Sequence, residues 1–208
     1  MRISMASLSQ FTVCCLMLAV APAMADTLYS NGPYNGTTDA WTINFGFSVS
    51  DAFNAFLNFG DIKGEDIVYW DPSTTDVLTT VDVQIGTTSF GGSIQTSGGV
   101  TNTFLGINQF GYSLFQGDFS INSIEWEGPG WFTLSNACTT GGCSENPIYW
   151  DENSGPSTAY ENSVGSIPSE AFTLTGTSGG ATPEPSSIML FGSGILSLAG
   201  ILRRKLMG

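Results

Sequence analysis

Apolar side chains alternate with polar or small ones along three stretches of the chain. Trp41–Val49 has an apolar residue at every second position, Phe53–Phe59 repeats this spacing, and Val81–Ile85 does so with Asp82 and Gln84 between its apolar residues. Because successive side chains of a β-strand point to opposite faces, this alternation predicts strands that bury one face and expose the other.

Shorter apolar pairs with the same spacing predict further strands, separated by glycine-rich turn signals. Outside the two ends of the chain we find no 3.6-residue period of the kind that marks an amphipathic helix. This pattern predicts an all-β protein, built as a single antiparallel β-sandwich or jelly roll. The pairs are Tyr112/Leu114, Phe119/Ile121, Ile124/Trp126 and Phe172/Leu174, and the turn signals are Gly91–Gly92, Ser97–Gly99, Gly117–Asp118, Gly128–Gly130 and Gly141–Gly142.

The first 25 residues have the pattern of an export signal. Arg2 precedes the apolar run Phe11–Val20, and Ala23-Met24-Ala25 has the small residues that a signal peptidase cuts after. The run is too short to span a bilayer, so we expect residues 1–25 to be a cleaved signal peptide.

A second apolar stretch, residues 186–202, lies near the other end of the chain. At ~1.5 Å per residue it gives a helix of about 25 Å, which is short but sufficient to cross a membrane. Arg203, Arg204 and Lys205 follow it, and the positive-inside rule keeps such residues in the cytoplasm. The sequence therefore predicts a C-terminal transmembrane helix, preceded by Pro183, Glu184 and Pro185.

This order of a Pro-Glu-Pro motif, a short apolar helix and a basic cluster resembles the PEP-CTERM family of bacterial sorting tails. The resemblance implies a partner, a membrane-embedded protease of the exosortase type that recognises the tail. It also implies a host that makes exopolysaccharide or biofilm matrix. The protein would be anchored in the inner membrane before processing and then reach the cell surface or the extracellular space.

These features divide the chain into four parts. Residues 1–25 are the signal peptide, 26–175 the β-sandwich ectodomain, 176–182 a Gly/Ser/Thr linker, and 183–208 the sorting tail. Within the tail, 183–185 is the motif, 186–202 the membrane helix and 203–205 the basic cluster.

The amino-acid composition excludes several classes of function. The chain has no histidine, which excludes His-dependent nucleophiles and HExxH zinc sites. Residues 26–182 contain 17 acids against Lys63 alone, a net charge of −16. Such a surface repels nucleic acid and attracts cations.

Cys138 and Cys143 flank a Thr-Thr-Gly-Gly loop. In an oxidising compartment two such thiols favour a disulfide. Two cysteines without histidine supply too few ligands for zinc, and the spacing is not the CxxC of oxidoreductases.

The densest polar and aromatic cluster is Tyr149, Trp150, Asp151, Glu152 and Asn153, and Tyr69-Trp70-Asp71 repeats its first three residues. Aromatic rings beside carboxylates and amides are typical of sugar-binding surfaces. The cluster is therefore our candidate glycan contact. The alternative is two strand ends with their aromatic rings in the core.

Two carboxylate pairs are candidates for glycan hydrolysis. Glu125 and Glu127 flank Trp126 on a predicted strand and would project from one face ~6.6 Å apart, near the separation in inverting glycosidases. Alternation explains them equally well as the polar face of a half-buried strand. Asp151 and Glu152 form the second pair.

Calcium is the cofactor that suits so acidic a domain. Asp61, Glu65 and Asp66 share one loop-like segment, and Asp151, Glu152 and Asn153 share another. Neither has the spacing of a known calcium motif, so we assign no metal ligand and expect no resident cofactor.

Taken together, we expect a non-enzymatic, exported protein with a structural or carbohydrate-adhesive role in exopolysaccharide. A glycan-processing enzyme and a calcium-dependent adhesion protein are the alternatives.

Overall fold

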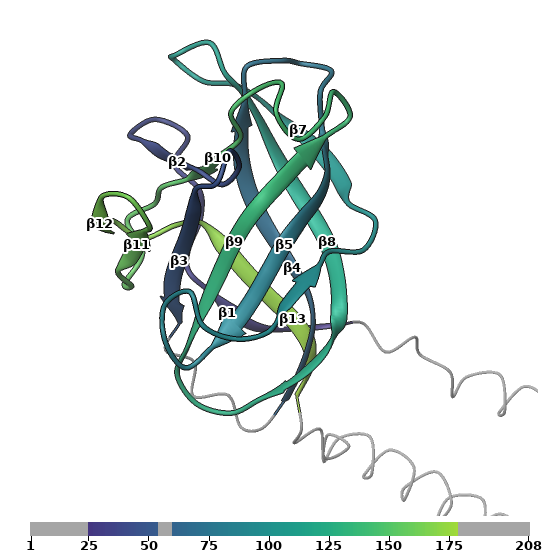
Figure 1. Ribbon diagram of the computed structural model, residues 1–208, viewed down its shortest axis with the longest axis vertical. Helices are drawn as coiled ribbons and strands as arrows, with labels where there is room; N and C mark the ends of the chain where they lie inside the picture. The colour runs from purple at the N-terminus through teal and green to yellow at the C-terminus, as the bar shows by residue number, and fades with distance from the viewer. Residues whose placement is uncertain (1–24, 54–59, 179–208) are drawn as a thin grey trace, which may run out of the picture.

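The computed structural model describes residues 25–53 and 60–178, and this part of the chain forms strands and no helix. The described residues form thirteen strands in two antiparallel sheets, here called sheet A and sheet B (Figure 1). Of the expected signal peptide, residues 1–25, all but the last residue lie outside the described ranges, as do the motif, membrane helix and basic cluster at 183–205. Within the described ranges no helix is long and apolar enough to cross a membrane.

Sheet A is centred on the long strand β4. In the order β1-β13-β4-β10-β2, strands β13 and β10 share one edge of β4, while β8 pairs with its other edge and β7 pairs with β8. Its strands are β1 (Asp26–Ser30), β2 (Ala40–Thr42), β4 (Gly60–Asp71), β7 (Thr101–Ile107), β8 (Ser113–Trp126), β10 (Tyr149–Asp151) and β13 (Phe172–Ser178).

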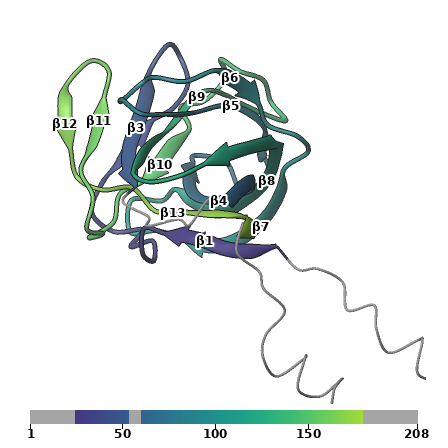
Figure 2. The same ribbon diagram turned by 90° about the horizontal axis from the view of Figure 1, so that it is seen from below.

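Sheet B has the order β12-β11-β3-β9-β5-β6. Figure 2 shows the β11–β12 hairpin standing at one side of the fold. The strands of sheet B are β3 (Ser48–Phe53), β5 (Leu78–Gly86), β6 (Ile94–Thr96), β9 (Gly130–Thr139), β11 (Ala159–Glu161) and β12 (Gly165–Ile167).

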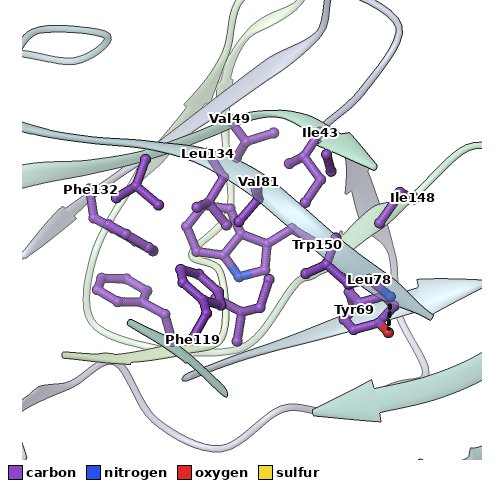
Figure 3. Close-up of a cluster of buried hydrophobic side chains, with 14 of the residues drawn as sticks. Ile43, Val49, Tyr69, Leu78, Val81, Phe119, Phe132, Leu134, Ile148 and Trp150 are labelled. Atoms are coloured by element: carbon purple, nitrogen blue, oxygen red, sulfur yellow. Dashed lines mark hydrogen bonds between the residues drawn. The ribbon is translucent and has the colours of Figure 1, made fainter. Parts of the chain in front are cut away.

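Buried hydrophobic side chains from both sheets form one core cluster among the described residues. Trp150 of β10 is at its centre, in edge contact with the ring of Phe132 from β9 (Figure 3). Tyr69 of β4 is also fully buried, and its hydroxyl accepts a hydrogen bond from the Leu78 N–H at 2.9 Å. Burial of side chains from both sheets supplies the main favourable free energy of folding.

Alternation correctly predicts β5, in which Val81, Val83 and Ile85 are buried while Asp82 and Gln84 are partly exposed. It also predicts the paired, buried positions of Phe172 and Leu174 in β13.

The expected continuous strand over Trp41–Val49 is wrong. The chain turns at Asn44–Phe47, where the Phe47 N–H donates to the Asn44 carbonyl at 3.0 Å and both Phe45 and Gly46 have positive φ. Two successive positive φ angles define a tight turn that alternating apolar residues do not reveal. The chain passes here from β2 in sheet A to β3 in sheet B, and Phe45 and Phe47 are exposed.

Two further expectations are corrected. Gly117–Asp118 is not a turn but lies within β8, which joins three predicted short strands into one. The linker expected from residue 176 does not begin there, because β13 continues to Ser178 and pairs with Gly60–Ile62 of β4. The remaining linker residues, 179–182, lie outside the described part of the chain.

Candidate functional site

The two Tyr-Trp-Asp triplets lie side by side in sheet A. β10 pairs antiparallel with β4, so that Tyr149 is opposite Trp70 and Trp150 is opposite Tyr69. Directly opposed residues point to the same face of a sheet. Trp150 and Tyr69 therefore face the core, while Trp70 and Tyr149 face outward.

This arrangement corrects the candidate glycan contact at three of its five residues. The ring of Trp150 has no exposed surface, and its indole N–H donates to the Ala171 carbonyl at 2.8 Å. Asp151 and Asn153 are also buried. A sugar cannot stack on a ring with no open face, so only Tyr149 and Glu152, both partly exposed, remain as surface residues.

Asp151 fastens a surface loop instead. Its carboxylate accepts hydrogen bonds from the Trp70 indole at 2.5 Å, the Asn35 N–H at 2.9 Å and the Gly36 N–H at 3.0 Å. Burial raises the pKa of Asp151 to about 6, and these donors oppose part of that effect. Because both oxygens are occupied, Asp151 holds the Asn35–Asp39 segment against the sheet.

Asn153 belongs to a second buried network. Its side-chain NH₂ donates to the Asn31 carbonyl at 2.8 Å, and its oxygen accepts from Ser169 at 2.8 Å. The Asn31 NH₂ in turn contacts Asp51 at 2.9 Å. These bonds join the segment after β10 to the residue that follows β1, to Asp51 within β3 and to the segment before β13, which gives Asn153 a structural role.

An aromatic hollow of about 410 Å³ opens on the outer side of these strands. Trp70 is its floor, with only 5% of its surface exposed, and the ring of Phe110 stacks on it at 5.9 Å between centroids. Tyr112 makes an edge contact with Tyr149 at 5.6 Å. The residues that line this aromatic hollow are Thr38, Asp39, Ala40, Trp70, Phe110, Tyr112 and Tyr149.

Asn108 shapes the β7–β8 loop that carries Phe110. Its side-chain oxygen accepts from the N–H groups of Phe110 and Tyr112, each at 3.0 Å. The side-chain NH₂ of Gln109 donates to the Thr37 carbonyl at 2.7 Å, which ties this loop to the segment that Asp151 holds. Both walls of the hollow are thus positioned by hydrogen bonds. In the sequence, Trp70 is part of a repeated triplet and Tyr112 part of a predicted strand, but no pattern indicated that Phe110 or Tyr112 belongs to a site.

The two candidate catalytic pairs lie in different environments. Asp151 is buried and Glu152 is its neighbour in sequence, beyond the end of β10, with its N–H donating to the Asp39 carbonyl at 3.1 Å. Glu125, near the end of β8, and Glu127, just after it, are both exposed, and Glu125 is opposite Asp61 of β4. The carboxylate of Asp151 thus takes part in structural hydrogen bonds. Glu125 and Glu127 occupy solvent-facing positions, which the alternation of side chains along a strand explains without catalysis.

A carboxylate pair that the sequence did not suggest lies across β4 and β8. Asp66 is opposite Asp118, and burial together with a hydrogen bond and charge repulsion from Asp118 raises the pKa of Asp66 to about 6. Carboxyl groups that bond directly to each other leave no room for the sugar carbon or water that a glycosidase places between them. This geometry therefore gives no support to hydrolysis.

The first calcium candidate, Asp61, Glu65 and Asp66, lies on strand β4 and not in a loop, and its three carboxylates differ in burial. Glu65 is completely buried, with no hydrogen-bond partner for either oxygen, while Asp61 and Asp66 are partly exposed. Burial, followed by the charge of Asp66, raises the pKa of Glu65 to about 8. Among the described residues no group of three or more His, Cys, Asp or Glu side chains could hold a metal ion.

The predicted disulfide is present between Cys138 and Cys143, at the end of β9. It closes a loop that Asp76 also holds, by accepting hydrogen bonds from the Thr140 hydroxyl at 2.8 Å and the Gly141 N–H at 2.7 Å.

A larger hollow of about 670 Å³ lies between Trp131, Tyr160, Pro129 and Pro156. Phe53 also lines it and directly precedes residues 54–59, which are outside the described ranges. We therefore base no site on this hollow.

The described residues form a disulfide-bonded, all-β domain with an aromatic hollow on one sheet. Residues 181–205 match the family model described as the PEP-CTERM protein-sorting motif, as the sequence predicts. The chain therefore carries the sorting signal of an exported protein that is held at the membrane before an exosortase processes it. A comparison with curated proteins finds no match.

Proposed function

We propose that this protein is an adhesive component of the extracellular matrix that binds carbohydrate in its aromatic hollow. The sorting motif brings the domain to the outside of the cell, and the hollow is the surface on which it would meet exopolysaccharide. The observation that carries the proposal is the group of rings around Trp70, where Phe110 is 54% exposed and Tyr112 and Tyr149 are partly exposed.

Aromatic rings that remain open to water despite a large core next to them suit a flat, partly apolar ligand. Sugar rings present such faces, and aromatic side chains bury a large apolar area when a ligand covers them. Thr38 and Asp39 supply oxygens at the rim that sugar hydroxyls can bond. The hollow is open to solvent, so it fits a segment of polymer better than it fits an enclosed small molecule.

The test is glycan-array binding by the purified exported protein, followed by titration of the best ligand. Phe110→Ala removes the most exposed ring of the hollow and should weaken binding about tenfold. Phe45→Ala is the matched control, because Phe45 is 48% exposed on the Asn44–Phe47 turn, outside the hollow. Unchanged affinity in Phe110→Ala, or an equal loss in Phe45→Ala, would show that the hollow is not the binding site.

A further inference from the structure

We propose that the glycan bound in the aromatic hollow carries free amino groups, so that the ligand is a cationic amino-sugar polymer. This inference rests on the proposed function and adds the chemical class of the ligand. It is carried by the combination of open aromatic faces with one acidic residue, Asp39, in the lining and by the position of the domain's lysine.

One acidic residue lines the hollow. Asp39 is exposed and belongs to the lining. Glu152 does not line it, although the Glu152 N–H donates to the Asp39 carbonyl at 3.1 Å. An ammonium group of a bound ligand could therefore pair with the carboxylate of Asp39 at the edge of the hollow.

The aromatic faces suit the same ligand. The electron-rich face of a Tyr or Phe ring attracts an ammonium group within about 6 Å. Tyr112, Tyr149 and Phe110 surround the hollow beside Asp39. An amino sugar offers both a flat ring for stacking and an ammonium group for the rim.

Within the part of the chain that the structure describes, no positive side chain lines the hollow to receive an acidic sugar. Lys63 is the one basic residue in the described ranges, and it lies near the start of β4, whereas Trp70 is near the end. Seven residues of strand separate them by about 23 Å. Lys63 is also engaged with Asp61 at 3.8 Å and Thr177 at 3.2 Å. A uronate or sulfated sugar in the hollow would therefore meet Asp39 with no compensating charge.

The test compares three short oligomers on the exported protein: glucosamine hexamer, N-acetylglucosamine hexamer and galacturonate hexamer. The first is cationic at a pH where its amines are protonated, the second is neutral and the third is anionic. We expect the glucosamine hexamer to bind most tightly and the galacturonate hexamer not to bind.

Asp39→Asn separates a specific rim contact from general attraction to an acidic protein. It should weaken glucosamine binding about fivefold, the upper range for an exposed ion pair. Glu127→Gln removes the same charge from an exposed position elsewhere and should leave the affinity unchanged.

The outcomes are distinguishable. Equal or tighter binding of the acetylated hexamer, still lost in Phe110→Ala, would overturn the amino-sugar inference and leave the proposed function intact. Equal weakening by Asp39→Asn and Glu127→Gln would overturn it as well, because the attraction would then be non-specific. Absence of binding to all three hexamers and to the glycan array would overturn both proposals.

Discussion

The indole N–H of Trp70 donates a hydrogen bond to the carboxylate of Asp151, a residue 81 positions further along the chain. This bond joins the floor of the aromatic hollow to the residue that fastens its wall. The Asp151 side chain thus links the fold of sheet A to the shape of the candidate site.

Asp151→Ala should lower the free energy of unfolding by about 3 kcal/mol, because the Trp70, Asn35 and Gly36 N–H groups lose their acceptor. Urea denaturation measures this change. Glu152→Ala is the control, since Glu152 is adjacent and only partly buried, and it should cost under about 1 kcal/mol. Similar losses in the two variants would contradict the fastening role of Asp151.

Stability should fall as the pH rises from 5 to 8. Burial raises the pKa of Glu65 from 4.5 to about 8, so the folded state keeps a proton that the unfolded state has released. Folding then binds protons, and the free energy of unfolding decreases with pH by at most about 1.4 kcal/mol per pH unit for this group. Denaturation at a series of pH values tests the sign.

Glu65→Gln removes this titration and should make the pH dependence shallower. The exposed Glu127→Gln should not change the slope. Constant or rising stability between pH 5 and 8 would show that Glu65 is ionised in the folded protein.

Replacing both Cys138 and Cys143 by serine should lower the free energy of unfolding by roughly 2 kcal/mol. The loop that they close is short, so the entropy that the disulfide removes from the unfolded chain is at the lower end of the usual range. Comparison of the double variant with the oxidised parent by thermal denaturation measures the effect. A melting temperature equal to that of the parent would mean that the Asp76 hydrogen bonds alone hold the loop.

Gly176→Ala should strongly destabilise the protein. A Cβ at this position would collide with the Asp61 carbonyl oxygen, because β13 and β4 approach closely where their register shifts. Gly99→Ala is the matched control, with open space around its Cβ. Loss of folded protein in Gly176→Ala alone, seen by circular dichroism, would confirm that residue 176 belongs to the sheet, and two well-folded variants would contradict it.

The sequence predicted the fold class because burial alternates along β5 and β13 in the way a two-faced strand requires. It failed at Asn44–Phe47, where the apolar pattern continues but the backbone turns. Gly46 was the visible signal, yet a single glycine inside an alternating stretch does not distinguish a turn from a strand.

The candidate site, too, could be predicted only in part from the sequence. Composition alone singled out Tyr149-Trp150-Asp151, but composition does not tell which face of a strand becomes buried. The antiparallel register places Trp150 inward and Trp70 outward, although both occupy the middle of the same triplet. Phe110 and Tyr112 join the site only through a loop whose position depends on long-range contacts.

The place of β13 in sheet A affects how the domain would carry mechanical load. β13 lies between β1 and β4 and pairs with both, and the chain leaves it at Ser178 toward the sorting motif. Tension between a membrane-held tail and a ligand on the domain would pull along this strand. The force would then act as shear on the backbone hydrogen bonds along both sides of β13. These bonds would have to break together and not one after another.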